Sequence, residues 1–438
     1  MQEAIMRWLA IACGWVFGIT GCGSDATGNS DSVRPVEVFF LLTPLSATAL
    51  DELTAVYQQQ HPGGEITKTT GTSDFTDQIL SRFEDGAPPD LFQTMGGRYL
   101  CGWVTSSQSY VENLDALAAE HHWTDVTVMP QVVQDSVRCT GPDGDQHFYG
   151  VPMVVNRANT LFHNRKIFAE ADIAAPPASI DEFFQVADTL KQRMPEITPF
   201  ALGTAPMAGG PWALGAVLFE GIAAGMHGTD WYVKFFSGRA DLSNNATEDW
   251  SKLRAVLEAG ARLLDYVNPN LDEIGLGGVL EMLRLDQAAM TITGDWPNGV
   301  DLTTGWSIND SCDGQSAFGP MYGLSVDVFA LSKGAKNRAG AMDFLSSAAT
   351  REGQDAYALV VGGIPPEITT LDSRYNEYAR GAAADFAVAG DQLVFVNVPM
   401  RPEAFATPVL AELSSFQTDK NVDALMLTIR NNYGRLKE

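Results

Sequence analysis

The sequence predicts an α/β protein with more than one domain, and three observations carry that prediction. Residues 36–42 are apolar enough for a strand buried on both faces, and an amphipathic helix at 46–60 leads to a second strand at 65–70. Late in the chain, the small apolar residues 288–293 predict another short buried strand. A length of 438 residues is too great for one small core and suits two or three domains.

The composition is that of a soluble globular protein with a strong acidic excess. Hydrophobic residues make up 45% of the chain and charged residues 19%. The net charge of −26 at pH 7 argues against nucleic-acid binding, which needs a basic face, and against adsorption to anionic lipid. It does not choose among neutral ligands.

The N-terminus has the pattern of a secretion signal. Residues 1–21 combine a basic Arg7 with the apolar run 8–19, which is too short to span a bilayer as a helix. Ile19-Thr20-Gly21-Cys22 resembles a bacterial lipobox, in which cleavage leaves Cys22 as a lipid-modified N-terminus. Residues 22–35 would then be a lipidated, flexible tether. The alternatives are an ordinary signal peptide cut nearby and a start codon assigned too early.

The cysteines fit an oxidising compartment but leave one unpaired. Of Cys13, Cys22, Cys101, Cys139 and Cys312, the first leaves with the signal and the second is the lipidation site. Three cysteines then remain. Cys101 and Cys139 can pair across a long loop, with Cys312 free or buried. There is no Cys-x-x-Cys, and the six histidines lack metal-ligand spacing, so no metal and no cofactor are expected.

The remaining elements alternate between helix and strand for most of the chain. Ser179 is a good N-cap for a helix at 179–194, and Glu182, three residues later, completes a capping box. Other helices are expected at 74–84, 130–137, 213–224, 250–264 and 338–349, strands at 91–95, 149–157, 200–203 and 326–331, and a hairpin at 139–147. Residues 371–438 are expected to be largely helical.

Asp295 and Trp296 follow the buried strand at 288–293 and precede a Pro297-Asn298-Gly299 turn. They therefore sit at the carboxyl end of a strand, where open α/β sheets bind ligands. A carboxylate accepts hydrogen bonds from neighbouring hydroxyls, and a flat indole covers the apolar C–H face of a sugar. The alternative is that Trp296 belongs to the core and Asp295 caps the turn.

Here the sequence resembles a known family. A small-residue strand ending in Gly-Asp-Trp is similar to the extracellular solute-binding proteins of bacterial ABC importers, and more narrowly to their carbohydrate-binding family 1, which includes glucose/mannose-binding members. Gly86-Ala87-Pro88-Pro89-Asp90-Leu91-Phe92-Gln93, Tyr149-Gly150-Val151-Pro152, the segment from Asp327 to Asn337 and Gly362-Gly363-Ile364-Pro365 also match. The resemblance covers nearly all of the chain after the tether.

The resemblance implies a two-lobed periplasmic-binding-protein fold of type II, with hinge crossovers and a ligand cleft between the lobes. Residues 36–152 and 325–368 would form lobe one, and 153–324 and 369–438 lobe two. The chain would cross near Pro152, near residues 323–325 and near Glu367. Ligand binding would close the lobes by a hinge motion.

The resemblance also implies ligand contacts beyond Asp295 and Trp296. They are Gln93, Asn156, Arg157, Trp212, Asp327, Lys333 and Gly363. Asn156 and Arg157 could instead satisfy backbone groups at the crossover, Trp212 could be a core residue, and Lys333 could lie in a solvated turn. Met95 stands where the glucose-binding branch has a histidine, and Leu41-Leu42-Thr43 replaces its tryptophan pair. These departures point to a different sugar or a more apolar ligand.

By resemblance, the chain captures a carbohydrate, a monosaccharide or short oligosaccharide, and delivers it to the permease subunits of an ABC transporter. It would act as a monomer in the periplasm or cell envelope, held to the membrane by its N-terminal lipid alone. An enzyme is not expected, because Gly-x-Ser-x-Gly, P-loop, Rossmann and His-Glu-x-x-His motifs are absent. The alternatives are the same fold binding a polyol or organic ion, and a surface lipoprotein for adhesion or sensing.

Overall fold

The computed structural model describes residues 34–41, 44–71, 75–104, 109–205, 210–299, 305–367, 371–396 and 403–437. The described residues from Pro35 onwards form one compact unit. The expected signal peptide, the lipidation site Cys22 and nearly all of the 22–35 tether lie outside the described residues. In the described part of the chain, no helix has both the length and the apolar character that crossing a membrane requires.

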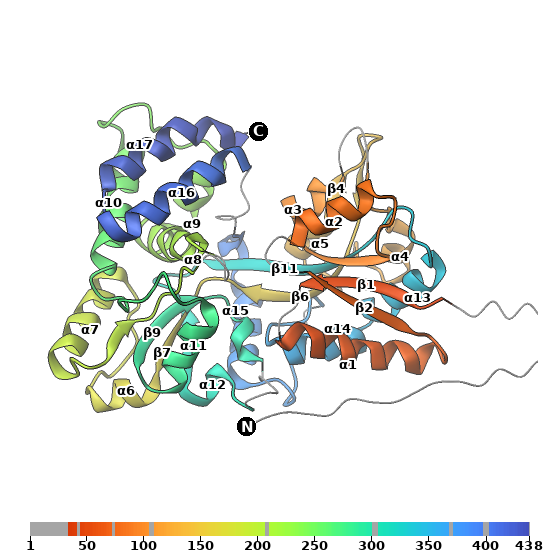
Figure 1. Ribbon diagram of the computed structural model, residues 1–438, viewed down its shortest axis with the longest axis horizontal. Helices are drawn as coiled ribbons and strands as arrows, with labels where there is room; N and C mark the ends of the chain where they lie inside the picture. The colour runs from red at the N-terminus through yellow and green to blue at the C-terminus, as the bar shows by residue number, and fades with distance from the viewer. Residues whose placement is uncertain are drawn as a thin grey trace, which may run out of the picture. The chain divides into compact units, whose positions relative to one another are not determined.

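The first sheet collects strands from four separate parts of the chain (Figure 1). It contains β1 (Val36–Leu41), β2 (Ile66–Gly71), β3 (Leu91–Met95), β6 (Val151–Arg157), β11 (Tyr322–Leu331) and β12 (Leu393–Phe395). The order is β12-β11-β3-β1-β2, with β6 also paired to β11. Strands β1, β2 and β3 are parallel, whereas β11 runs antiparallel to both β3 and β6.

Helices cover both faces of this sheet, which explains why most residues of β1, β6 and β11 are buried. Figure 1 shows α1 (Pro44–Gln60) and α14 (Arg351–Val361) on one face, with α2 (Phe75–Glu84), α3 (Arg98–Gly102) and α5 (Gln131–Val137) towards the other. Val38, Leu50, Phe92, Phe329 and Phe344 are all buried in the first hydrophobic core. This part also contains α4 (Asp115–Glu120) and α13 (Arg338–Ala349).

The second sheet has its own helices and its own core. Its order is β10 (Cys312–Ser316), β7 (Thr160–Asn164), β9 (Ala288–Thr293) and β8 (Thr198–Phe200). Around it lie α6 (Arg165–Glu170), α7 (Ile180–Arg193), α8 (Trp212–Ala216), a π-helical segment (Val217–Ala223), α9 (Ala224–Phe236), α10 (Glu248–Leu263), α11 (Leu276–Arg284), α12 (Ile308–Ser311), α16 (Glu403–Asp419) and α17 (Val422–Asn432). Phe183, Phe200, Leu218 and Met290 are among its fully buried residues.

Two segments of the chain run between the first and the second sheet, one from β6 to β7 and the other from β10 to β11. Asn159, between β6 and β7, connects these two crossover segments. Its side chain is fully buried. Its Nδ2 donates to the carbonyl of Met321 at 3.0 Å, and its Oδ1 accepts from the amide of Gly323 at 2.9 Å. A single amide side chain therefore joins the end of one crossover strand to the start of the other.

Most expected elements are present, and three strands coincide closely with their predicted ranges: β1, β3 and β9. The helix expected at 213–224 is instead α8, the π-helical segment and α9 in succession. Strand β8 spans residues 198–200 rather than 200–203. Elements α12, β10 and β12 were not predicted, because their short polar or unpatterned sequences carry no periodic signal.

The assignment of residues 369–438 to lobe two does not match the packing. Helix α15 (Glu377–Val388) places Ala379 and Phe386 in the first core, and β12 extends the first sheet by pairing with β11. From this segment, α16, α17 and the 3₁₀ turn at Tyr433–Lys437 contribute buried residues to the second core, and Val394 of β12 packs against it. The apolar face of α15 predicted a helix, but not the sheet against which it packs.

Cys101 and Cys139 form a disulfide that joins α3 to the hairpin of β4 (Arg138–Thr140) and β5 (Gln146–Phe148). This is the pairing considered from the sequence, and Cys312 is free and buried. The bond closes a loop between positions 38 residues apart, which limits the conformations of the unfolded chain.

We expect the double substitution Cys101→Ser and Cys139→Ser to lower the free energy of unfolding by about 2 to 4 kcal/mol, the usual range for closing a loop of this size. Urea unfolding at equilibrium measures the loss. Cys312→Ala is the control, since it removes a buried thiol without opening a cross-link. An unfolding midpoint for the double variant no lower than that of the control would contradict the expectation.

Candidate functional site

The turn after β9 is fixed to the end of the first crossover strand. The amide of Asp295 donates to the carbonyl of Arg157 at 2.9 Å. A single 3₁₀ turn (Trp296–Asn298) follows, and both the amide and the Nδ2 of Asn298 donate back to the carbonyl of Asp295. These bonds hold the backbone on both sides of Trp296.

Two tryptophans meet beside this turn. Trp212 is the first residue of α8, and its ring centroid lies 6.5 Å from that of Trp296, with 39° between the ring planes. Both side chains are half-buried. The structure thus brings together two residues that are 84 positions apart (296 − 212) and that the sequence proposed separately. Adjacent, partly exposed indoles offer a flat apolar surface of the kind that packs against the C–H face of a sugar.

Asp295 itself is fully buried, rather than exposed beside Trp296. Burial raises the pKa of its carboxyl to about 7, although the nearby Arg157 opposes the rise. Neither carboxylate oxygen has a hydrogen-bond partner of acceptable geometry among the described residues, although Tyr378 lies near enough to favour the ionised form. In this conformation the backbone of Asp295 holds the turn, and its carboxyl group does not line an open surface.

Arg157 is a buried cationic residue at the crossover between the two sheets. Its guanidinium is nearly inaccessible, donates from Nη2 to the carboxylate of Asp385 at 2.7 Å and lies 4.1 Å from the centroid of the Tyr322 ring. Its Nε has no hydrogen-bond partner among the described residues. Arg157 therefore connects the turn at Asp295 with α15 and with the start of β11, a bracing geometry that leaves little of it for a ligand.

Asn156 and Gly363 lie against each other next to Arg157. A side chain on Gly363 would place its first carbon 2.4 Å from Oδ1 of Asn156, so the glycine leaves room for the buried amide. Oδ1 of Asn156 has no partner among the described residues. The neighbouring residues Val155 and Ile364 exchange two backbone hydrogen bonds. Three predicted site residues, Asn156, Arg157 and Gly363, thus converge at the crossover.

Gln93 and Asp327 form a polar pair at the carboxyl ends of β1 and β3. Nε2 of Gln93 donates to Asp327 at 3.4 Å, and Oε1 of Gln93 accepts from the amide of Leu41 at 3.2 Å. Burial raises the pKa of Asp327 to about 6, and the bond from Gln93 opposes the rise. Both side chains are half-buried, so they keep a surface through which to bind.

The structure does not bring Lys333 to the other candidates. Its side chain is exposed, its amide donates to the carbonyl of Tyr110, and the adjacent Ser332 amide donates to the carbonyl of Asp90, just before β3 begins. Because β11 is antiparallel to β3, the residue that follows β11 lies beyond the amino end of β3, whereas Asp327 lies at its carboxyl end. Lys333 occupies a solvated turn, as the alternative interpretation held.

Three further residues surround the candidates at the crossover without having been predicted. Tyr322 stacks on Arg157, Asp385 pairs with it, and the hydroxyl of Tyr378 lies 2.8 Å from that of Thr160. Tyr322 precedes the strand expected at 326–331, and the other two lie in the helical tail assigned to lobe two. No local pattern in the sequence links them to the site.

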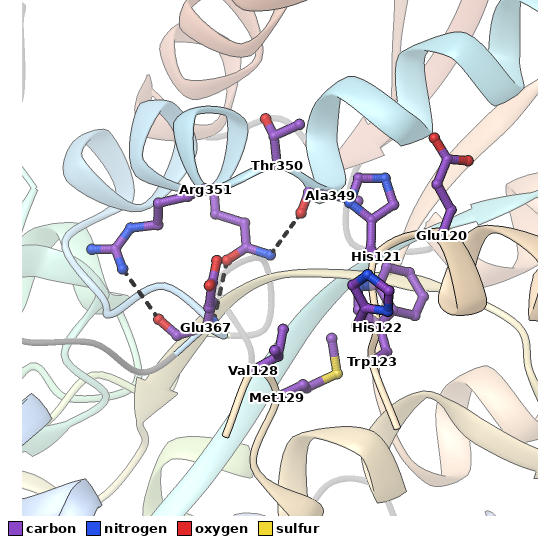
Figure 2. Close-up of a pocket in the computed structure, with 11 residues that line it drawn as sticks. Glu120, His121, His122, Trp123, Val128, Met129, Ala349, Thr350, Arg351 and Glu367 are labelled. Atoms are coloured by element: carbon purple, nitrogen blue, oxygen red, sulfur yellow. Dashed lines mark hydrogen bonds between the residues drawn. The ribbon is translucent and has the colours of Figure 1, made fainter. Parts of the chain in front are cut away.

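A separate cavity of about 330 Å³ opens in the part of the chain that contains the first sheet (Figure 2). Its lining includes His121, His122, Trp123, Arg351 and Glu367, and none of the predicted ligand contacts. Figure 2 shows the guanidinium of Arg351 directed towards the backbone of Glu367; its Nε is also paired with Asp355 at 2.8 Å. With its cation already engaged and both charge signs at its rim, this cavity is a weaker candidate for solute binding.

Among the described residues, no group of three or more His, Cys, Asp or Glu side chains is arranged to hold a metal ion.

The model for bacterial extracellular solute-binding proteins matches residues 43–355, so the chain belongs to this family. An uncharacterized ABC transporter extracellular-binding protein of Pyrococcus horikoshii is 27% identical over 433 residues, which cover 96% of this chain and 92% of the relative.

Solved structures show the same periplasmic-binding-protein fold. The bacterial solute receptor AcbH, described as having an exclusive preference for β-D-galactopyranose, superposes with a TM-score of 0.73 at 16% identity, covering 91% of this chain and 97% of that one. A chitin oligosaccharide binding protein gives a TM-score of 0.69 at 18% identity, with 92% and 99% covered. At these identities the likeness establishes the fold alone.

The buried carboxyl of Asp295 predicts a defined pH dependence of stability. Because its pKa is raised from 3.8 to about 7, the folded protein retains a proton that the unfolded chain releases as pH rises above about 4. The resulting destabilisation is absent at low pH and grows towards neutrality. We expect Asp295→Asn to gain stability relative to the wild type between about pH 4 and pH 7.5, by on the order of 4 kcal/mol.

Denaturant unfolding across that pH range measures this difference, with the exposed Asp272→Asn as the matched control. Parallel stability curves for the wild type and Asp295→Asn would show that Asp295 is not protonated in the folded state.

Proposed function

We propose that this protein is the solute-capturing component of an ABC importer and that its solute is a carbohydrate. The observation that carries the proposal is the Trp212–Trp296 pair, two half-buried indoles from separate elements placed side by side. Aromatic rings of this kind supply a large apolar contact area with defined geometry. The name of the P. horikoshii relative supports the transporter class, and the names of the two solved structures, which bind galactopyranose and chitin oligosaccharide, support a carbohydrate ligand.

Polar groups from the first sheet would complete the recognition. Asp327 lies opposite Met95, the last residue of β3, and the side chain of Gln93 reaches Leu41, the last residue of β1. The pair is therefore near the carboxyl ends of two parallel strands, the position at which open α/β sheets bind ligands. An amide and a carboxyl provide both donors and acceptors for sugar hydroxyls. The crossover residues Asn156 and Gly363 would lie at the hinge between the two parts, and the backbone hydrogen bonds of Asp295 would hold the turn that carries Trp296.

The protein would bind its solute without transforming it. Closure of the two parts around a sugar, by the hinge motion expected of the fold, would create the form that a membrane permease accepts, and ATP hydrolysis would take place on a separate subunit. Cys22 would carry the lipid that keeps the protein at the cell envelope, and the protein would act as a monomer. Met95 stands where the glucose-binding branch of the family has a histidine, which argues against glucose as the preferred sugar.

Thermal unfolding of the purified protein against monosaccharides, disaccharides, polyols and amino acids tests the ligand class. A compound that binds only the folded state raises the midpoint by mass action. We expect at least one sugar to raise it. If a non-sugar compound alone raises the midpoint, the carbohydrate proposal is wrong while the transport class stands.

The tryptophan pair can be tested once a sugar is identified. We expect Trp296→Ala and Trp212→Ala each to weaken sugar binding by about tenfold, because each removes one aromatic contact worth about 1 kcal/mol or more. Titration calorimetry measures the change. Trp250→Phe in α10 serves as the control, because its position is outside the proposed site. Unchanged affinity in both alanine variants would place the ligand elsewhere.

A further inference from the structure

Gly294 connects β9 to the turn at Asp295, and its backbone conformation does not require a glycine. Its φ lies outside the left-handed region, unlike that of Gly362 at +97°. An alanine could adopt the same backbone conformation without strain. What the structure uses at this position is the missing side chain.

The indole of Trp296 occupies the space that a side chain on Gly294 would fill. A Cβ built on Gly294 would lie 1.8 Å from Cζ3 and 2.2 Å from Cε3 and Cη2 of Trp296. Carbon atoms in contact are normally about 3.5 to 4.0 Å apart. The six-membered ring therefore lies directly on the backbone of Gly294, and any side chain there would force the ring to move by more than about 1.5 Å.

The backbone around Trp296 cannot absorb that movement easily. The Asp295 amide is bonded to the Arg157 carbonyl and the Asn298 amide to the Asp295 carbonyl, both at 2.9 Å, and Pro297 restricts its own φ. The displacement would fall on the side-chain torsions of Trp296. The centroid of the Trp296 ring lies 6.5 Å from that of the Trp212 ring, so a rotation changes the spacing and angle of the pair.

We propose that Gly294 is a positioning residue: by leaving its side-chain space to Trp296, it sets the angle and spacing of the Trp212–Trp296 pair and thereby the affinity for the ring that stacks there. The geometric part stands on the contacts alone, and the part that concerns affinity rests on the proposed carbohydrate function. A purely structural role would affect stability without changing the coupling between the two indoles.

Near-ultraviolet circular dichroism of the ligand-free protein measures the coupling between the two indoles. The signal that two neighbouring indole rings produce together depends on the angle between them. The difference spectrum between the wild type and Trp212→Phe defines the signal of the pair. We expect Gly294→Ala to reduce or invert it and Gly277→Ala to leave it intact. Gly277 is exposed on α11 with nothing within 4 Å of the position of an added Cβ. An unchanged signal in Gly294→Ala overturns the proposal whatever happens to binding.

Affinity for the sugar found in the panel supplies the second readout. We expect Gly294→Ala to weaken binding about three- to tenfold, the factor that the loss of one aromatic contact produces, with no change in Gly277→Ala. A changed spectrum with full affinity would overturn the affinity part. If no sugar binds the wild type but the spectrum changes as expected, the positioning role is supported and the carbohydrate function is the part that fails.

A double-mutant cycle keeps the proposal testable if Gly294→Ala folds poorly. In a Trp296→Ala background no indole fills the space, so adding Gly294→Ala should bring no further loss of stability. An equal loss in both backgrounds would show that Gly294 acts independently of the ring and would overturn the proposal.

Discussion

Strand β11 is the constraint on which the arrangement of the site depends. Its first residues pair with β12, its middle with β6 and its last with β3. Because it is antiparallel to β3, its early half lies at the carboxyl ends of the parallel strands, where Asp327 meets Gln93. The same direction carries Lys333 to the opposite end of the sheet. One strand direction thus decides which of the candidate residues can act together.

The buried polar side chains at the crossover between the two sheets lower the stability of the fold. Asn156, Arg157 and Asp295 are almost completely buried, and each has at least one polar atom without a partner among the described residues. Such atoms are uncommon in folded proteins, and each costs about 1 to 3 kcal/mol. Arg157 offsets part of this cost through Asp385 and the Tyr322 ring. The segment that links the two sheets is therefore held by a few specific polar contacts.

The sequence predicted best where the local pattern alone decides the structure. Residues 36–41 and 288–293 are mainly apolar and end at turn-forming residues, and both are strands in the structure. Strand β10, with sequence Cys-Asp-Gly-Gln-Ser, has little intrinsic strand propensity and forms because β7 offers it a partner. Nothing local distinguishes such a strand from a loop.

The site was predictable in part for the same reason. Trp212 and Trp296 could each be proposed from their surroundings, but their contact depends on the packing of α8 beside the β9 turn. The burial of Asp295 and the roles of Tyr322, Tyr378 and Asp385 depend on tertiary structure alone. Lys333 was proposed because its motif resembles that of a family. A sequence motif does not show at which end of the sheet its residues lie.

The most direct test is a crystal structure of the protein with the sugar that most raises its unfolding temperature. The account predicts electron density for a sugar ring packed against Trp296 and Trp212, with hydroxyl groups within hydrogen-bonding distance of Gln93 or Asp327. A sugar bound away from both tryptophans, for example in the cavity beside His121 and Arg351, would contradict it.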